Sequence, residues 1–297
     1  MSAQFFGSIT ALITPFKNDE VDYKAFEKFI EWQIEEGSHG LVPSGTTGES
    51  PTLTYDETKL IFELCVQTVK SSGKKTPVIA GTGSNSTREA VELSLIAQNA
   101  GADALLSVTP YYNKPTQDGI YAHFKAVHDS TDLPIILYNV PGRTVTEICV
   151  ETVLRLAELP RIVGIKDATS DTSRTTLIRG QVKDNFSILS GEDALAGAFL
   201  AQGANGCISV TSNVAPRLCA DLQNAWIDND RTRFEELQIK LAPLNKALFC
   251  ESNPSPIKYA VSKLGLSSDE VRLPLLPASG NARKAVDDAM AKVGLAV

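Results

Sequence analysis

Eight short runs of apolar and β-branched residues recur along the chain, and segments with helical periodicity lie between them. The runs are residues 8–14, 40–43, 77–81, 104–108, 134–139, 162–167, 187–190 and 207–210. Strands that are apolar almost throughout and alternate with helices are typical of parallel sheets that helices cover. Eight such units predict an α/β protein with a closed (β/α)8 barrel, the TIM-barrel fold.

A doubly wound open sheet is the alternative fold. It would need a G-x-G-x-x-G turn after an early strand, and Gly81-Thr82-Gly83 lacks the third glycine. From residue 230 onward the pattern is helical only, with no strand signal and no flexible linker before it. We therefore expect the barrel over residues 1–229 and a C-terminal helical region, an appendage, over residues 230–297.

Composition excludes several classes of partner and location. The 297 residues carry a net charge of −7, which provides no basic surface for nucleic acid or anionic lipid. The five cysteines form no C-x-x-C pair, so we interpret them as reduced core thiols of a cytoplasmic protein. The start lacks a signal-peptide pattern, and the uncharged stretch 194–216 is interrupted by a turn cluster at 202–206. We expect neither export nor a membrane span.

Lys166 is the residue that most constrains the chemistry, because barrel active sites lie at the carboxyl ends of the strands. Strand alternation places Gly164 and Lys166 on one face, and Gly164 would leave room for a long side chain or a ligand. If that face points inward, a desolvated amine could attack a carbonyl. If it does not, Lys166 is a rim lysine paired with Asp167, and spacing alone leaves both interpretations open.

Other strand ends carry weaker signals of the same kind. Tyr138 could relay protons in a pocket or simply pack with a wet hydroxyl. Thr46 and Thr47, in a glycine-bounded turn, offer hydroxyls and amides to a carboxylate, although such a turn can be a plain loop. Arg143 is either a carboxylate clamp or a solvated loop charge.

The sequence gives no sign of a metal or a cofactor. The three histidines, at positions 39, 123 and 128, lie away from the strand ends, so we expect no metal site. The loops after the last two strands contain Glu192 and Asp193 but no lysine or arginine, which favours an unphosphorylated substrate. No nucleotide-binding motif is present, and we expect no redox cofactor.

Four motifs taken together identify a family. They are residues 45–49 (Gly-Thr-Thr-Gly-Glu), 109–113 (Thr-Pro-Tyr-Tyr-Asn), 138–144 (Tyr-Asn-Val-Pro-Gly-Arg-Thr) and 164–168 (Gly-Ile-Lys-Asp-Ala). From about residue 7 to 277 the chain resembles the dihydrodipicolinate synthase (4-hydroxy-tetrahydrodipicolinate synthase) family, within the superfamily of pyruvate-dependent class I aldolases. The first and last motifs are shared with N-acetylneuraminate lyase, whereas the other two favour the synthases.

The resemblance implies a lyase that condenses pyruvate with L-aspartate 4-semialdehyde, the committed step of diaminopimelate and lysine biosynthesis. Lys166 would form a Schiff base with pyruvate, and its enamine would attack the aldehyde before the adduct cyclises. Tyr138 would act as acid and base, linked through Thr46 to a Tyr112 that reaches in from a neighbouring subunit. The same family resemblance implies a homotetramer built as a dimer of dimers.

The resemblance also assigns binding residues. Thr47 would hold the pyruvate carboxylate and Arg143 the semialdehyde carboxylate, while Gly191 and Ile208 would line the pocket with backbone groups. Many members are inhibited by lysine at the tight-dimer interface. The corresponding positions here are Ser50, Pro51, Tyr55, Thr58, Asn85, Glu89 and Tyr111. The chain departs from lysine-sensitive enterobacterial-type members at Tyr55 and Thr58, where those members carry histidines.

Three alternatives remain at this point. The same Schiff-base chemistry could serve a sugar-acid substrate, as in N-acetylneuraminate lyase or a keto-deoxy sugar acid aldolase. A non-catalytic barrel could bind an oxo acid or an amino acid as a sensor. A metal-dependent aldolase is the third, and full activity in excess EDTA would exclude it.

Overall fold

The structure is a computed structural model that describes residues 3–295. Within these residues eight strands are parallel members of one sheet, and a short antiparallel hairpin stands apart from them. The parallel strands are β1 (Gly7–Ala11), β4 (Gly40–Val42), β5 (Ile79–Gly81), β6 (Ala104–Val108), β7 (Ile135–Asn139), β8 (Ile162–Asp167), β9 (Ser187–Ser190) and β10 (Gly206–Ser209). The hairpin is β2 (Phe16–Lys17) with β3 (Glu20–Val21).

Helices follow the strands and then fill the C-terminal part of the chain. They are α1 (Tyr23–Glu35), α2 (Tyr55–Ser72), α3 (Thr87–Ala100), α4 (Gln117–Ser130), α5 (Pro141–Thr144), α6 (Val150–Ala157), α7 (Ser173–Arg179), α8 (Ala196–Ala201), α9 (Pro216–Ile227), α10 (Arg231–Ala247), α11 (Ser255–Lys263) and α12 (Gly280–Val293). Three short 3-10 helices are η1 (Ser50–Thr52), η2 (Asp193–Leu195) and η3 (Thr211–Asn213). The predicted class, a (β/α)8 barrel with C-terminal helices, is confirmed.

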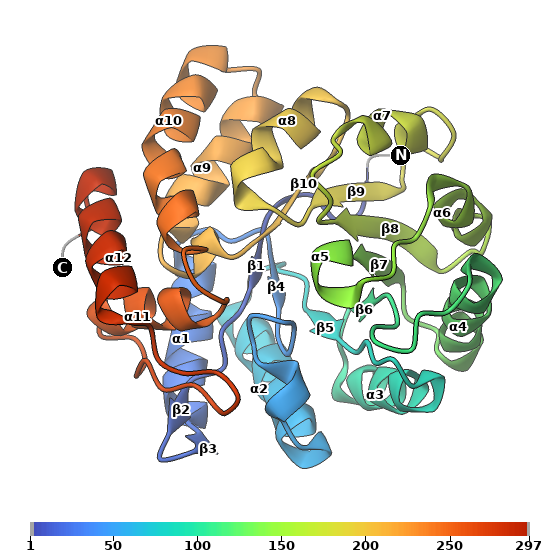
Figure 1. Cartoon of the computed structure of the whole chain (residues 1–297), viewed down its shortest axis with the longest axis horizontal. Coiled ribbons are helices and arrows are strands. Elements are labelled where there is room, and N and C mark those ends of the chain that lie inside the picture. The colour runs from blue at the N-terminus through green and yellow to red at the C-terminus, as the bar shows by residue number, and fades with distance from the viewer. Residues whose placement is uncertain (1–2, 296–297) are drawn as a thin grey trace. The chain divides into compact units, whose positions relative to one another are not determined.

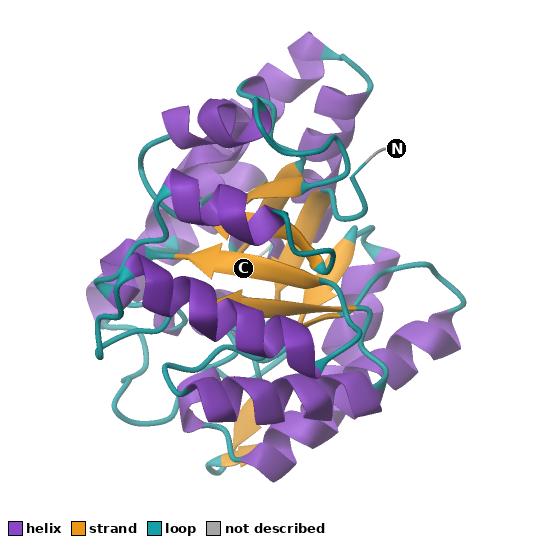
Figure 2. Ribbon diagram, turned by 90° about the vertical axis from the view of Figure 1, so that its right-hand side faces the viewer, coloured by secondary structure: helices purple, strands orange, loops and turns teal. Residues whose placement is uncertain are grey.

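The chain divides into two compact units. Among the described residues, unit 1 holds 3–6 and 77–208, and unit 2 holds 7–76 and 209–295. In unit 1 strands β5 to β10 pair in chain order, and α3, α4, α6 and α7 pack side by side outside them (Figures 1 and 2). In unit 2 β1 pairs with β4, and α1 packs against α2. The predicted domain boundary between residues 229 and 230 falls between α9 and α10 and stays a prediction.

An irregularity in β8 sets its register against β7. Ile135 pairs with Ile162, but the next residue, Ile136, pairs with Gly164, so Val163 is an extra residue on β8. Such a bulge shifts every later pair by one position. Because of this shift Tyr138 of β7 stands opposite Lys166 of β8.

Capping by side chains marks the starts of two helices, completely at α2 and in part at α3. At α2, Thr54 and Glu57 form the complete reciprocal capping box. At α3, the Ser86 side chain accepts from the backbone amide of Glu89. The Glu89 carboxylate accepts from the hydroxyl of Ser84 at 2.8 Å, so the reciprocal bond of a capping box is not formed. The start of α3 was therefore predictable, whereas the orientation of Glu89 was not.

The uncharged stretch 194–216 is divided as expected. It contains α8, a turn beginning at Gln202, and then β10. Among the described residues no helix is both long and apolar enough to cross a membrane.

The interpretation of all five cysteines as core thiols is wrong for one of them. Cys65, Cys207 and Cys219 are buried. Cys149 is half-buried and Cys250 is exposed. Cys250 follows α10, where the chain leaves the helix toward a solvent-facing turn, so its position in an apolar stretch of sequence did not guarantee burial.

Candidate active site

The Lys166 side chain is buried at the carboxyl end of β8. Its residue is 5% exposed, and its Nζ lies 4.4 Å from the centroid of the Tyr138 ring. Tyr138 is itself buried, at the carboxyl end of the adjacent strand. The structure thus brings together the two strongest candidates from the sequence. A buried lysine amine at the carboxyl end of a barrel strand is where a nucleophile of this fold is expected.

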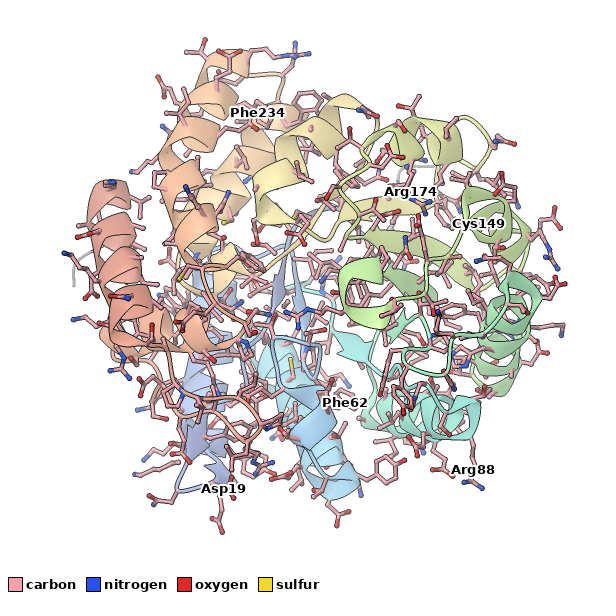
Figure 3. The ribbon with its side chains drawn as sticks, in the orientation of Figure 1. Asp19, Phe62, Arg88, Cys149, Arg174 and Phe234 are labelled. Atoms are coloured by element: carbon pink, nitrogen blue, oxygen red, sulfur yellow. The ribbon has the colours of Figure 1, made fainter. Side chains whose placement is uncertain are left out.

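Asp167 is not the partner of Lys166. Its carboxylate accepts from Nε of Arg174 at 2.9 Å and from the backbone amide of Thr169 at 2.9 Å. Arg174, labelled in Figure 3, also donates to the carbonyl of Ile148 at 2.8 Å and is buried. The interpretation of Lys166 as a rim residue paired with Asp167 is therefore wrong, because alternation directs the two side chains to different neighbours.

Two glycines near Lys166 are required by close packing. At Gly191, a Cβ would lie 2.6 Å from Cβ of Ala168 and 3.1 Å from Cε of Lys166, so this glycine leaves space for the lysine side chain. At Gly164, a Cβ would lie 2.6 Å from the carbonyl oxygen of Ser187. Gly164 therefore allows β8 and β9 to approach each other. The prediction that it leaves room for a long side chain or a ligand is wrong, because the backbone of β9 occupies that space.

Charged groups after β7 and β9 act on the same region. Burial raises the pKa of the Glu192 carboxyl, the adjacent Asp193 raises it further, and the positive charges of Lys166 and Arg143 oppose both effects. Arg143 itself is exposed on the short helix α5. Its side chain is thus free to meet an anion, and its charge already reaches the acidic loop after β9.

The remaining predicted residues of unit 1 differ in exposure. Ile208 of β10 is completely buried, whereas Tyr112 is 89% exposed and has φ of 71°. Asn113 donates from its side-chain amide to the carbonyl of Asn85 at 2.9 Å, which joins the loop after β5 to the loop after β6. Through this contact Asn85 lies close in the fold to Tyr111, the residue that precedes Tyr112. Glu89, in the first turn of α3, is exposed.

In unit 2, the loop after β4 is buried and tightly held. Thr47 is 2% exposed, and its hydroxyl accepts from the side-chain amide of Asn253 at 3.0 Å. Glu49 is 2% exposed and forms a 2.6 Å ion pair with the fully buried Lys258. Thr46 is half-buried in the same loop, and Ser50 begins η1 directly after it.

Asn253 and Lys258 are contacts that sequence reasoning missed. The chain around them, Asn-Pro-Ser-Pro, indicates a helix start through its prolines. No local pattern indicates which loop the helix start will touch, because Asn253 and Thr47 are separated by 206 positions in the chain.

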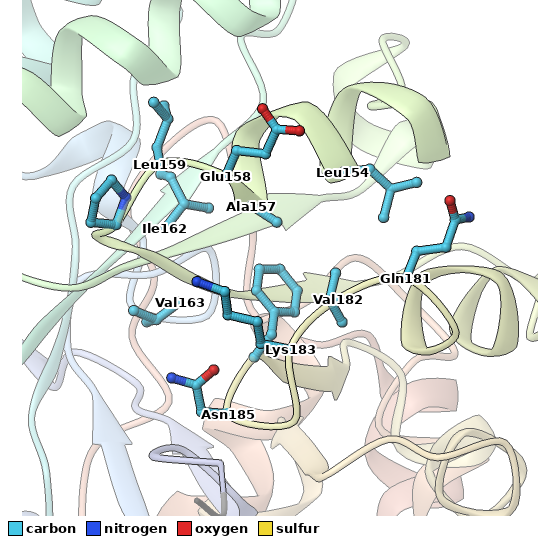
Figure 4. Close-up of a pocket in the computed structure, with 12 residues that line it drawn as sticks. Leu154, Ala157, Glu158, Leu159, Ile162, Val163, Gln181, Val182, Lys183 and Asn185 are labelled. Carbon is cyan, nitrogen blue, oxygen red and sulfur yellow. The ribbon is translucent and has the colours of Figure 1, made fainter.

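One hollow in the structure lies away from Lys166, at the other end of β8. A hollow of about 580 Å³ lies between α6 and the residues before β9, and Ile162 and Val163 line it at the amino end of β8 (Figure 4). Lys166 is four positions further along β8, roughly 13 Å at about 3.3 Å per residue. No group of three or more His, Cys, Asp or Glu side chains that could hold a metal occurs among residues 3–295.

Comparison with known proteins points in one direction. The sequence matches the model of the Dihydrodipicolinate synthetase family over residues 4–293. It is 57% identical to the 4-hydroxy-tetrahydrodipicolinate synthase of Parvibaculum lavamentivorans, over 98% of this chain and 99% of that one.

Solved structures agree with this match. The chloride-inhibited dihydrodipicolinate synthase of Acinetobacter baumannii, complexed with pyruvate, is 44% identical with a TM-score of 0.94, covering 98% of this chain and 99% of that one. A structure described as the first monomeric dihydrodipicolinate synthase variant is 40% identical, again with a TM-score of 0.94 and 98% of both chains covered.

The buried ion pair of Asp167 with Arg174 gives a test of the framework that holds the end of β8. Asp167→Ala leaves the buried guanidinium of Arg174 without its buried partner, so we expect a loss of about 3–5 kcal/mol in the free energy of unfolding. Glu147→Ala removes the half-exposed carboxylate that contacts the same arginine at 2.8 Å, and should cost at most about 1 kcal/mol. Urea unfolding measures both. Equal losses in the two variants would contradict this account.

Proposed function

Because the chain belongs to the dihydrodipicolinate synthetase family, we propose that it condenses pyruvate with L-aspartate 4-semialdehyde to give 4-hydroxy-tetrahydrodipicolinate. The observation that carries the proposal is the buried amine of Lys166 beside the Tyr138 ring, at the carboxyl ends of neighbouring strands. The proposed role is a lyase in lysine and diaminopimelate biosynthesis.

The proposed reaction begins with carbon–nitrogen bond formation at Lys166. The Nζ lone pair attacks the keto carbon of pyruvate, and the keto oxygen leaves as water to give a protonated imine. Loss of a methyl proton yields an enamine, whose carbon attacks the aldehyde carbon of the second substrate. The amino group of that substrate then displaces Nζ from the imine carbon, which closes the ring and frees the lysine. One water is lost overall.

Each step needs proton transfer, for which Tyr138 is proposed as the acid and base. The centroid of its ring lies 4.4 Å from Nζ, and a phenol can both give and take a proton. Thr46 is proposed as the link from Tyr138 to Tyr112. Thr47 is proposed to bind the pyruvate carboxylate, Arg143 the semialdehyde carboxylate, and Gly191 and Ile208 to line the pocket through their backbones.

The proposed substrate pair is tested by a coupled assay that follows reduction of the product. We expect turnover with pyruvate and aspartate 4-semialdehyde, retained in excess EDTA, and no cleavage of N-acetylneuraminate. Arg143→Met should raise KM for the semialdehyde about tenfold, as the loss of a charge-assisted contact predicts, and leave KM for pyruvate nearly unchanged. Cleavage of a sugar acid without condensation would instead favour the lyase branch of the superfamily.

We further propose a homotetramer built as a dimer of dimers, in which Tyr112 serves the site of a neighbouring subunit. The support is the 89% exposure of the Tyr112 side chain within a single chain, together with its positive φ. A large aromatic residue held outward in this way is typical of an interface anchor.

Subunit mixing tests the role of Tyr112. Tyr112→Phe and Lys166→Ala should each lower kcat by about 10²-fold or more when alone. A hybrid of the two restores one complete site, because the Lys166→Ala subunit supplies Tyr112 to the Lys166 of its partner. We expect activity to reappear when the variants are refolded together. If native mass spectrometry shows hybrids without recovered activity, or a fully active monomer, Tyr112 does not act in trans.

Two further assignments accompany this proposal. Ser50, Asn85, Glu89 and Tyr111 are proposed as an amino-acid site, and adding lysine to the coupled assay tests it. Tyr55 and Thr58 stand where lysine-sensitive members carry histidines, so we do not expect strong inhibition by lysine. A cytoplasmic location is proposed because the five cysteines are an odd set without a C-x-x-C pair, which favours reduced thiols.

A further inference from the structure

Asn253, in the C-terminal part of the chain, contacts the loop that follows β4. Asn253 lies in the segment between α10 and α11 and is 5% exposed. Its Nδ2 donates to the hydroxyl oxygen of Thr47 at 3.0 Å. Both residues belong to unit 2. A region that the sequence presents only as a helical appendage therefore contacts a proposed substrate-binding residue.

This hydrogen bond fixes what the Thr47 hydroxyl can do. A hydroxyl has one proton to donate and two lone pairs that accept. Because the Thr47 oxygen accepts from Asn253, its own proton stays available to another acceptor. A carboxylate is an acceptor only, so it needs donors aimed at it. The amide of Asn253 thus leaves Thr47 in the state that suits an anion.

The carbonyl oxygen of the Asn253 side chain, Oδ1, is in a destabilising position. Within residues 3–295, Oδ1 of Asn253 is buried and has no hydrogen-bond partner. An unpartnered buried acceptor is destabilising. With the amide reversed, Oδ1 would accept the hydroxyl proton of Thr47, which could then no longer be donated to a carboxylate. The observed arrangement keeps that proton available at the expense of one buried acceptor.

A second contact holds the same two segments together. Glu49, two residues after Thr47, pairs with Lys258 at 2.6 Å, and Lys258 lies in α11 five residues after Asn253. The other carboxylate oxygen of Glu49 accepts from the backbone amide of Arg272 at 3.0 Å. Both charged side chains are fully buried, so separating them would leave uncompensated charge. The pair therefore fixes the separation of loop and helix at which Asn253 meets Thr47.

We propose that Asn253 is a positioning residue for carboxylate recognition, acting through the Thr47 hydroxyl. The inference rests on the proposed function, in which Thr47 binds the carboxylate of pyruvate. Asn253 touches no reacting atom in this account. It orients a donor, and its removal should weaken substrate binding much more than chemistry.

Steady-state kinetics on Asn253→Ala, Thr47→Val and the double variant test this inference. We expect Asn253→Ala to raise KM for pyruvate about tenfold, the equivalent of one hydrogen bond to a charged group, with kcat changed less than about twofold. Because both residues act through one hydroxyl, the double variant should bind pyruvate no more weakly than Thr47→Val alone. Effects that multiply in the double variant would overturn the inference.

Two further variants separate positioning from loosening of the fold. Ser255→Ala alters the buried start of α11 without touching Thr47, and should keep the wild-type KM. An equal rise in KM for Ser255→Ala would overturn the inference, because the helix start and not the hydrogen bond would then be responsible. If Asn253→Ala fails to fold, the isosteric Asn253→Asp decides. Its carboxylate accepts the Thr47 proton and repels an anion, so KM should rise even further.

These measurements distinguish an error in the role of Asn253 from an error in the proposed function. If the wild-type protein binds pyruvate covalently but Asn253→Ala and Asn253→Asp keep the wild-type KM, only the role of Asn253 is wrong. If the wild-type protein neither traps nor turns over pyruvate, the proposed function itself is wrong.

Discussion

The register between β7 and β8 determines which side chain stands beside Lys166. The extra residue Val163 shifts the pairing by one position, so Tyr138 meets Lys166. Without that residue Tyr138 would stand opposite Ile165, and the lysine would pair with Asn139. A shift of one position also exchanges the two faces of a strand. The proposed chemistry therefore depends on a single inserted residue at the far end of β8.

Two buried lysines show how environment separates structural from chemical roles. Lys258 has a carboxylate at 2.6 Å, and burial nevertheless lowers its pKa to about 8. Among the described residues no carboxylate lies within ion-pair distance of Lys166, whose Nζ faces the Tyr138 ring. Both amines face an aromatic ring, since Nζ of Lys258 lies 4.0 Å from the centroid of the Phe16 ring, so the counter-ion is what separates them. An amine with a buried carboxylate partner is committed to that ion pair, whereas Lys166 has no such partner and lies beside Gly191. The contrast supports Lys166 as the nucleophile and Lys258 as part of the framework.

The sequence predicted the strand ends because each is bounded by turn chemistry and carries its polar residues after an apolar run. β6, β8 and β9 have the predicted bounds, and Lys166 and Tyr138 lie at the predicted ends. The sequence could not predict the Val163 bulge, because one additional apolar residue leaves the pattern of an apolar strand unchanged. It also could not predict the packing reason for Gly164 or the contact of Asn253 with Thr47. Both depend on which distant segments meet in the folded chain.

Covalent trapping at a mapped position tests the central claim most directly. The protein is incubated with pyruvate and borohydride, its intact mass is measured, and the modified peptide is identified. The account predicts one pyruvate-sized adduct per chain on the peptide that contains Lys166, and its loss in Lys166→Ala. An adduct on the peptide that contains Lys258, or no adduct at all, would contradict it.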